Sequence, residues 1–481
     1  MRPYLRLAAV FVLFYSFANA QAPDKAAKID QLARQYTDCC GFTGTVLVSE
    51  HDKVIFKGGY GFADREWSIP NAPDVKFRLG SITKQFTSML ILQQVAKGTI
   101  KLDGHISDYL PYYRKDTSSR VTVTQLLNHT SGIPSYTDDP KFFPDVSRNY
   151  YAVDDFVTKF CSGDLQFEPG SKFHYDNSGY FLLGAILEHV TGKKYEALLQ
   201  ENILAPVGMH DTGYDHWSAI LPKRASGYSQ TLDGIENAPY LDMSLPYAAG
   251  SLYSTVEDLY KWDQALYTDK LLSADLKQKM FTPGLENYGF AWVILTIPKD
   301  EPGAGKTIIT HGGGINGFNT SEVRIIEDHD LIVIFNNTPG ASLNDFGKGI
   351  RAILYGQEPT PPKRSLVRDL REIVHNQGVD AAIAKYKELK AANSPNYEFK
   401  EEVLNRLGGD LLEKERVSDA ITVFKLNVEE YPKSGNVYDS LGEAYAKAGN
   451  KQLAIEAYKR SLELDPKNQN AIDQLKELQK P

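Results

Sequence analysis

The hydrophobic pattern of the first 357 residues changes from strand-like runs to helical spacing and back to strands. Short apolar runs at 43–48 and 53–56 predict two strands joined by a polar turn. A longer apolar stretch at 86–95 predicts a buried helix. The region from about 120 to 280 is mostly helical with polar loops, and the region 288–337 predicts further strands. We therefore expect an α+β fold, with one antiparallel sheet built from both ends of the domain, flanking helices and an inserted helical lobe.

Beyond this domain, which we place at residues 25–357, the pattern becomes entirely helical and repeats itself. A linker rich in proline and basic residues is expected at 358–366, followed by helical repeats at 367–481. Two series of residues are separated by 34 positions, the period of tetratricopeptide repeats: Leu407-Gly408, Leu411, Ala420, Phe424 and Pro432, and then Leu441-Gly442, Tyr445, Ala454, Tyr458 and Pro466.

An earlier repeat is degenerate and carries an insertion, as indicated by Ala382, Ile383 and Tyr386. The tail from Asn468 predicts a capping helix. Two clear units and one degenerate unit are near the minimum for a stable array, so docking of the repeats on the preceding domain is the alternative to an array that stands free. Such repeats are more often a protein-binding groove than a catalytic part.

The N-terminus has the order of a secretory signal peptide, which we place at residues 1–20. Arg2 and Arg6 flank an apolar run at 7–17, and Ala18-Asn19-Ala20 supplies a small-residue cleavage site. A buried N-terminal helix is the alternative. The run is too short to span a bilayer stably, so we expect an exported protein, periplasmic or extracellular, without a stable membrane anchor.

Charge and cysteine content exclude several classes of partner and cofactor. The chain of 481 residues has a formal net charge of −8, which provides no basic field for nucleic acid. Cys39 and Cys40 are adjacent and would be strained if joined to each other, whereas one of them could pair with Cys161, and the sequence leaves this open. No Cys-x-x-Cys pattern occurs, and we expect no metal and no cofactor.

Candidate chemistry begins at Ser81-Ile82-Thr83-Lys84, where the predicted buried helix starts. Positions three apart share one face of a helix, so the Ser81 hydroxyl would lie beside the Lys84 amine. An amine whose pKa is lowered by burial can take the proton of a serine and make it a nucleophile. The alternative for an isolated match is a helix cap followed by a solvated lysine.

A second cluster contains Tyr175 and Asn177. These residues are two apart, so they face one direction in an extended segment. A phenol near a lysine ammonium would have a lowered pKa and could accept and donate protons, and the amide could donate to a substrate carbonyl. A polar turn is the alternative interpretation.

The third cluster, His311-Gly312-Gly313-Gly314, follows a predicted strand. Its glycines would let a substrate backbone lie against an edge strand. A free N–H here, together with the N–H of Ser81, would form a two-donor oxyanion hole. The alternative is a flexible glycine turn.

The order of the three clusters resembles the serine β-lactamase and penicillin-binding-protein family. The Tyr-x-Asn pattern is similar to its class C branch, which includes D-alanyl-D-alanine carboxypeptidases, D-amino-acid peptidases and esterases. The resemblance covers about residues 25–357 and extends to the stretches 42–48, 126–132, 206–209, 249–252 and 288–290.

This resemblance implies a role for each candidate residue. Ser81 would be the nucleophile, Lys84 its proton partner, and Tyr175 the general base for acylation and the acid for the leaving group. Asn177 would position the acyl amide. The N–H of Ser81 and a backbone N–H of the third motif, that of Gly314, would form the oxyanion hole, with Gly313 and His311 beside the substrate.

His311 departs from the lactamase pattern, which has a lysine at this position. Histidine is mostly neutral at pH 7, so efficient β-lactam turnover is not expected, and peptidase or esterase activity is favoured. Our function hypothesis is an exported serine hydrolase that forms a Ser81 acyl-enzyme on a small-molecule or peptide substrate. The alternative is a penicillin-recognising sensor with little turnover, which signals through the C-terminal repeats to a protein partner.

Two other patterns are given structural interpretations. His129 and Ser131 could be taken for a Ser-His pair, but we expect them to be structural. The run Glu327-Asp328-His329-Asp330 could be taken for a metal site, but its place between two predicted strands favours a solvated turn.

Overall fold

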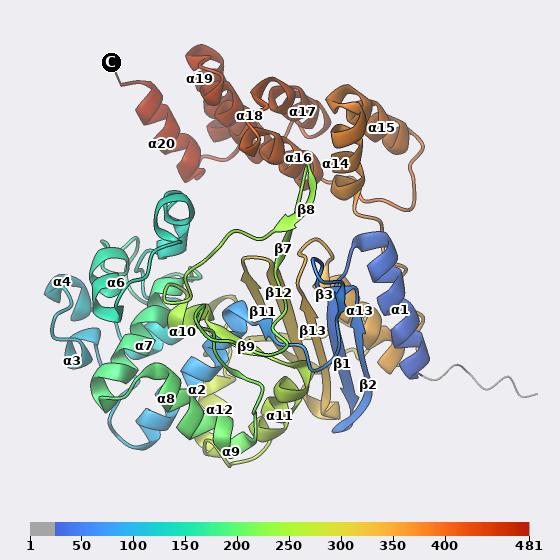
Figure 1. Cartoon of the computed structure of the whole chain (residues 1–481). Coiled ribbons are helices and arrows are strands. Elements are labelled where there is room, and N and C mark those ends of the chain that lie inside the picture. The colour runs from blue at the N-terminus through green and yellow to red at the C-terminus, as the bar shows by residue number, and fades with distance from the viewer. Residues whose placement is uncertain (1–24, 481) are drawn as a thin grey trace, which may run out of the picture.

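The computed structural model describes residues 25–480 (Figure 1). Within this range a domain of sheet and helices is followed by a domain of paired antiparallel helices. The expected α+β fold with an inserted helical lobe is confirmed, as is the helical repeat region. The signal peptide predicted at 1–20 lies outside the described residues.

A six-stranded antiparallel sheet forms the centre of the first domain. Its strand order is β10-β11-β12-β13-β1-β2, so the first two strands of the chain lie beside the last ones. Buried Val46 in the first strand pairs with buried Ile334 in the last. The strands are β1 (Gly44–Glu50), β2 (Lys53–Tyr60), β10 (Val293–Thr296), β11 (Thr307–Ile315), β12 (Phe318–Ile325) and β13 (Asp330–Asn336).

Helices cover both faces of this sheet, which explains why its central strands are apolar on both sides. α1 (Lys25–Cys40) and α13 (Leu343–Leu354) pack on one face in the same core as Val46. α2 (Thr83–Ala96) and α11 (Val256–Leu266) pack on the other face with Leu47. Successive residues of β1 therefore enter two different cores.

The helical lobe, residues 100–250, is inserted between α2 and α11. Its central helix, α7 (Asn177–Thr191), is buried, and the Asp176 carboxylate caps it by accepting a hydrogen bond from the Gly179 N–H at 2.8 Å. The other helices of the domain are short: α3 (Ile106–Tyr109), α4 (Lys115–Ser118), α5 (Val123–Leu127), α6 (Val153–Phe160), α8 (Tyr195–Leu199), α9 (Ala205–Val207), α10 (Tyr247–Gly250) and α12 (Ala274–Met280).

Three small sheets surround the main one. The hairpin of β7 (Tyr228–Thr231) and β8 (Gly234–Asn237) leaves the domain and reaches the repeat helices (Figure 1). The others pair β3 (Phe62–Asp64) with β4 (Ile69–Pro70), and β9 (Leu252–Ser254) with both β5 (Phe77–Arg78) and β6 (Gly213–Tyr214).

Up to residue 480, seven helices form the repeat region, and the recurring small and aromatic residues explain their pairing. A Cβ atom at Gly408 would lie 2.4 Å from the Phe424 ring, and one at Gly442 would lie 2.9 Å from the Tyr458 ring, so each glycine lets two helices approach. The helices are α14 (Leu366–Gln377), α15 (Val379–Ala391), α16 (Glu401–Glu413), α17 (Val417–Glu430), α18 (Gly435–Lys447), α19 (Lys451–Leu464) and α20 (Gln469–Leu478).

Two details differ from the sequence analysis. Cys39 and Cys40 are joined to each other at the end of α1, and Cys161 is a buried free thiol in the lobe core, so a pairing with Cys161 is wrong. In the region 288–337, where further strands are expected, the first strand begins only at Val293, because the Gly289 N–H donates to the Trp292 carbonyl at 2.8 Å and closes a turn there.

Between residues 25 and 480, no helix is long and apolar enough to cross a bilayer. The same residues contain no group of three or more histidine, cysteine or acidic side chains placed to hold a metal ion. The run 327–330 forms the turn between β12 and β13, in agreement with the sequence analysis.

Candidate active site

Ser81 lies in a single 3₁₀ turn (Gly80–Ile82) that directly precedes α2. Two side-chain contacts hold this turn in place. The Thr320 hydroxyl donates to the carbonyl of Leu79 at 2.8 Å, and the Thr83 hydroxyl accepts from the N–H of Leu252 at 3.1 Å. Ser81 is therefore fixed between the sheet and the strand that follows α10.

Lys84 occupies the first turn of α2 and is fully buried. Its Nζ atom lies 3.0 Å from Ser81 Oγ, 2.8 Å from Asn177 Oδ1 and 2.8 Å from the Ala249 carbonyl oxygen. Burial lowers the pKa of this amine to about 7, so a large fraction is neutral at neutral pH.

The neutral amine has only one orientation that satisfies its neighbours. It has two N–H donors and one lone pair. The Asn177 amide oxygen and the Ala249 carbonyl can only accept, so they take both N–H groups. The lone pair is left facing the Ser81 hydroxyl, which can then donate to Nζ. The predicted pairing of Ser81 with Lys84 thus has the geometry of a nucleophile and its base.

Tyr175 lies in the loop before α7, and its ring packs on the same amine. Lys84 Nζ is 4.9 Å from the ring centroid, and the ring of buried His129 is 4.3 Å away. The phenol oxygen is buried and makes no hydrogen bond of regular geometry with the described residues, although the neighbouring Ser81 side chain favours its ionised form.

The expected lowering of the Tyr175 pKa is wrong. Burial is the dominant cause and raises this pKa, while the Ser81 side chain opposes the rise only in part. Lys84 cannot supply the expected charge, because its amine is itself partly neutral near pH 7 and faces the ring. The phenol therefore stays protonated and is suited to donate a proton rather than to act first as a base.

Asn177 begins α7 and links the first cluster, which contains Lys84, to the second, which contains Tyr175. Its amide oxygen accepts from Lys84, and its Nδ2 donates to the Thr137 hydroxyl at 3.0 Å. The backbone N–H of Asn177 donates to the Ser135 hydroxyl at 3.0 Å. One Nδ2 proton remains beside Ser81 to meet a substrate carbonyl.

The third cluster lies on β11, at the edge of the sheet that faces Ser81. β11 and β12 are joined by a two-residue turn at 316–317, which makes the flanking residues Ile315 and Phe318 a hydrogen-bonded pair. Such pairs alternate along antiparallel strands, so the Gly314 N–H points away from β12. A Cβ atom at Gly80 would lie 2.8 Å from Gly314 N, which places that amide next to the Ser81 turn.

Gly313 is required for this approach. A Cβ atom there would lie 1.9 Å from the Leu79 carbonyl oxygen and 2.4 Å from Thr320 Oγ1. At Gly314, in contrast, an added Cβ would meet nothing within 4 Å. The glycines therefore bring β11 against the Ser81 turn, and the N–H groups of Ser81 and Gly314 can converge on one oxygen.

His311 is buried and belongs to a chain of three hydrogen-bonded side chains. His311 Nδ1 lies 2.5 Å from the Gly312 carbonyl, so this nitrogen carries the proton. His311 Nε2 therefore accepts from the Tyr288 hydroxyl at 2.9 Å. His129 Nδ1 accepts from the Asp176 N–H at 3.1 Å, so its Nε2 donates to the Tyr288 oxygen at 3.3 Å.

Both nitrogens of His311 are thus engaged within the protein. Burial, together with the nearby Lys84, lowers the pKa of His311 to about 4, so the ring is neutral at neutral pH. Sequence reasoning missed Tyr288 as a member of the site and assigned His129 only a structural role. Ser131 donates to the Asp176 carboxylate at 3.0 Å and does not pair with His129.

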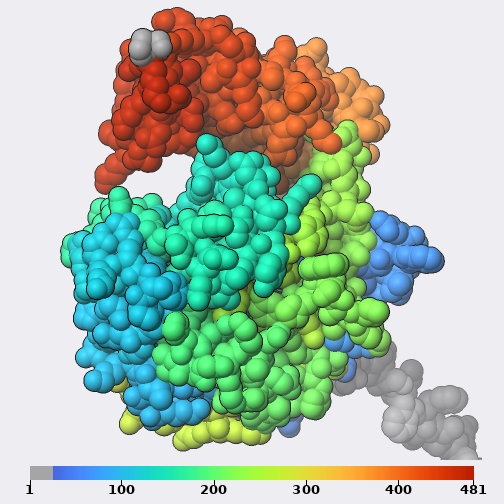
Figure 2. All heavy atoms as spheres, turned by 60° about the vertical axis from the view of Figure 1, so that its left-hand side comes forward, coloured from blue at the N-terminus to red at the C-terminus, as the bar shows by residue number. Residues whose placement is uncertain are grey.

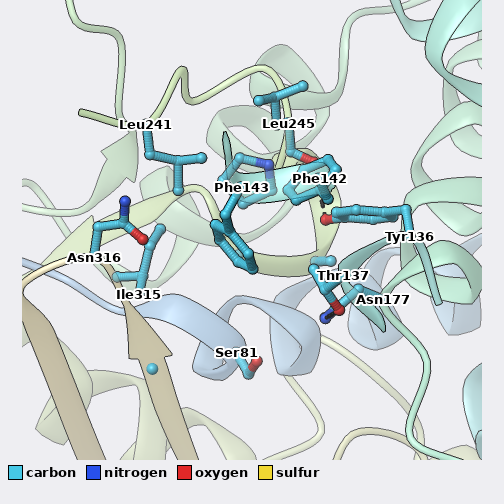
Figure 3. Close-up of a pocket in the computed structure, with 14 residues that line it drawn as sticks. Ser81, Tyr136, Thr137, Phe142, Phe143, Asn177, Leu241, Leu245, Ile315 and Asn316 are labelled. Atoms are coloured by element: carbon cyan, nitrogen blue, oxygen red, sulfur yellow. Dashed lines mark hydrogen bonds between the residues drawn. The ribbon is translucent and has the colours of Figure 1, made fainter. Parts of the chain in front are cut away.

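A cavity of about 90 Å³ opens above Ser81 (Figure 3). Asn177 and Gly314 lie on its walls, while Lys84, Tyr175, His311 and Gly313 lie outside its lining. The rest of the lining is largely apolar, and Figure 3 shows it to come from separate segments: Tyr136, Thr137, Phe142, Phe143, Leu241, Leu245, Pro246, Ala249, Gly250, Ile315 and Asn316.

Comparison with known proteins agrees with this geometry. Residues 29–353 match the family model described as beta-lactamase, and residues 440–468 match the tetratricopeptide repeat. The chain is 29% identical to a "Putative penicillin-binding protein PbpX" of Bacillus subtilis (strain 168), over 65% of this chain and 75% of that protein. It is 27% identical to a "Teichoic acid D-alanine hydrolase" of Staphylococcus aureus, over 56% of this chain and 62% of that protein.

Among solved structures, a D-stereospecific amidohydrolase from Streptomyces sp. is similar, with 26% identity and a TM-score of 0.59. The match covers 70% of this chain and all of that one (100%). The family match spans well over half of the described residues and includes all three clusters. The chain therefore belongs to the β-lactamase family of serine hydrolases and carries a tetratricopeptide repeat near its C-terminus.

Proposed function

We propose that the protein is an exported hydrolase that forms an acyl-enzyme on Ser81 and cleaves D-alanyl esters, amides or peptides. The observation that carries the proposal is the lone pair of Lys84, which two acceptor-only oxygens turn toward the Ser81 hydroxyl. Relatives support the substrate class, because one is named a D-alanine hydrolase and a similar structure is a D-stereospecific amidohydrolase.

Acylation begins with the neutral amine of Lys84. It takes the proton of Ser81 as Oγ forms a bond to the substrate carbonyl carbon. The carbonyl oxygen gains negative charge, which the N–H groups of Ser81 and Gly314 stabilise. The remaining Nδ2 proton of Asn177 holds the acyl group in position.

Loss of the leaving group needs a proton, and Tyr175 supplies it. Its phenol donates to the leaving nitrogen or oxygen as the bond to the carbonyl carbon breaks, and it regains a proton from the Lys84 ammonium. Water then attacks the acyl carbon and gives a proton to Lys84. The bond from that carbon to Ser81 Oγ breaks, the Lys84 ammonium returns the proton to Oγ, and the product acid is released. After one complete turnover, Ser81, Lys84 and Tyr175 are back in their starting protonation states.

The neutral His311 supplies no cation for a substrate carboxylate, which favours substrates without one. Both nitrogens of its ring are occupied inside the protein, and its lowered pKa removes the charge that a lysine would offer. A substrate carboxylate that entered the cavity would lose its hydration and gain no cation from His311 in return. Esters and neutral amides carry no such cost, and β-lactam turnover is disfavoured.

Export completes the proposal. The order of residues in 1–20 predicts a signal peptide, and a D-alanyl substrate would be met outside the cytoplasm. Secretion of the full chain, with sequencing of the mature N-terminus, tests this part.

A panel of substrates tests the enzymatic part. Wild type and Ser81→Ala are compared on a short acyl nitrophenyl ester, a D-alanyl ester, a D-Ala-D-Ala peptide and a chromogenic cephalosporin. The proposal expects ester or amide turnover that depends on Ser81, with little cephalosporin turnover. Stable labelling of Ser81 without turnover of any substrate would instead support the sensor hypothesis.

A further inference from the structure

The β7–β8 hairpin has a leucine at its tip, where a soluble hairpin normally exposes polar residues. Thr231 pairs with Gly234, so Leu232 and Asp233 form the two-residue turn. Leu232 is only 3% exposed, because it enters the hydrophobic core of the repeat helices, which includes Leu370 of α14. The hairpin tip is thus part of the repeat domain's core, although its strands start in the catalytic domain.

Charge complementarity surrounds this apolar contact. Lys414, at the C-terminal end of α16, forms an ion pair with Asp233 and lies 3.2 Å from the carboxylate of Glu236. His375 of α14 lies 3.8 Å from the Asp233 carboxylate. The surface formed by α14 and α16 therefore fits one aliphatic side chain flanked by carboxylates, and the hairpin supplies both. Figure 2 shows the yellow-green hairpin meeting the orange repeat helices.

The base of the hairpin rests on the turn at 316–317, which follows the active-site glycines of β11. A Cβ atom at Gly227 would lie 3.1 Å from Gly317 Cα, so the two backbones are in contact. The Asn316 side chain donates to the Pro239 carbonyl at 2.9 Å. Asn316 lies two residues after Gly314, whose N–H is assigned to the oxyanion hole, and its own side chain lines the cavity.

The chain that leaves the hairpin forms the opposite wall of the same cavity. Leu241, Leu245 and Pro246 face the space above Ser81, and Figure 3 shows the first two across from the Ser81 side chain. Ala249, three residues further, supplies the carbonyl that binds Lys84. One continuous segment, 227–249, therefore runs from the core of the repeat domain to the catalytic amine.

We propose that the face of α14 and α16 is a binding surface occupied by the chain's own β7–β8 hairpin, and that this contact sets the wall of the catalytic cavity. The repeat domain then influences substrate selection by holding this wall of the cavity in position. It governs which acyl groups fit above Ser81, through the position of the wall residues Leu241 and Leu245. This inference rests on the proposed function for its kinetic readout, but its structural readout is independent of activity.

The contact is tested in the full chain by Leu232→Asp, with Leu232→Met as the variant that keeps an apolar tip. Hydrogen exchange is measured on peptides covering 238–250 and 315–317. We expect hydrogen exchange in both segments to be faster in Leu232→Asp than in wild type, and to be unchanged in Leu232→Met. Unchanged exchange in a folded Leu232→Asp protein would overturn the proposal.

The charge contacts give a second test that does not depend on a buried substitution. Lys414→Glu should shift the ratio of kcat/KM for a bulky acyl ester to that for an acetyl ester by about fivefold or more. Adding Asp233→Lys and Glu236→Lys to Lys414→Glu should restore the ratio. Lys385→Glu, which removes the exposed Lys385–Glu388 pair within the repeat domain, is the matched control.

Failure of this inference is distinguishable from failure of the proposed function. If wild type hydrolyses no ester and Ser81 takes no phosphonate label, the proposed function is lost, but the exchange experiment still decides whether the hairpin carries the coupling. If wild type is active and the ratio is the same in Lys414→Glu, Lys385→Glu and the restored variant, the coupling proposal is overturned and the function stands.

Discussion

The Tyr288 hydroxyl donates a hydrogen bond of 2.9 Å to His311 Nε2, and this contact fixes the imidazole as a hydrogen-bond acceptor near Lys84. Burial, together with the charge of nearby Lys84, lowers the His311 pKa to about 4. Lys84 can therefore lose its own proton without competition from a neighbouring base that titrates near neutral pH.

Hydrolysis of an activated ester should rise with pH around the pKa of Lys84. The Lys84 pKa is lowered to about 7, and only the neutral amine accepts the Ser81 proton, so kcat/KM should increase from pH 5 to pH 8 and then level off. His311, with its pKa near 4, should contribute no step in this range. Initial rates between pH 5 and 9 measure this, and a flat profile would contradict the role of Lys84.

Tyr175→Phe should slow the hydrolysis of substrates with poor leaving groups much more than that of substrates with good ones. A nitrophenolate leaves without a proton, so ester hydrolysis should be nearly kept, whereas amide hydrolysis should fall by about 10²–10⁴-fold. Tyr386→Phe is the control, because its hydroxyl is also buried and without a hydrogen bond among the described residues, but it lies in the repeat region. An equal loss on both substrates would show that Tyr175 is not the acid.

Tyr288→Phe should remove one hydrogen bond of His311 and leave the contacts of Ser81 unchanged. Loss of the donor at Nε2 frees that nitrogen, so the His311 pKa should rise from about 4, whereas Lys84, with its pKa of about 7, still loses its proton while His311 is neutral. We therefore expect the acid limb of the pH profile to stay in place and kcat to fall by about tenfold as the hydrogen-bonded chain is lost. NMR titration of the His311 ring provides the independent readout, and an unchanged His311 pKa would contradict the hydrogen-bonded chain.

The two glycines of β11 should respond differently to alanine. Gly313→Ala forces a Cβ atom against the Leu79 carbonyl at 1.9 Å, so we expect a loss of about 1–3 kcal/mol of stability and loss of activity. Gly314→Ala meets nothing within 4 Å and should keep the melting temperature. Thermal unfolding of both variants measures this, and equal stability would show that β11 does not require the close approach at Gly313.

Much of the fold could be predicted from the sequence, because its strands and helices are determined by residues that lie close together along the chain. The apolar run at 43–48 falls in β1 from its second residue on, the run at 53–56 lies in β2, and the buried stretch 86–95 lies in α2. The recurrence of small and aromatic residues reflects direct helix contacts such as Gly408 against Phe424. Each of these features is determined by neighbours within one element or one helix pair.

Features that depend on burial by residues far away in the sequence could not be predicted in this way. The Tyr175 pKa rises because of the groups that surround the phenol, and no local pattern encodes that burial. The hairpin at 228–237 has a leucine tip whose partners lie more than 130 residues later, in α14 and beyond. Tyr288 joins the site only because the turn before β10 brings it beside His311.

The most direct test of the account is the mass of the Ser81 peptide after brief exposure to an acetyl nitrophenyl ester, in wild type and in Lys84→Met. Wild type should carry one acetyl group on Ser81 during turnover, and Lys84→Met, which keeps the side-chain bulk but removes the amine, should remain unmodified over the same time. Acetylation of both proteins at the same rate, or of a residue other than Ser81 in wild type, would contradict it.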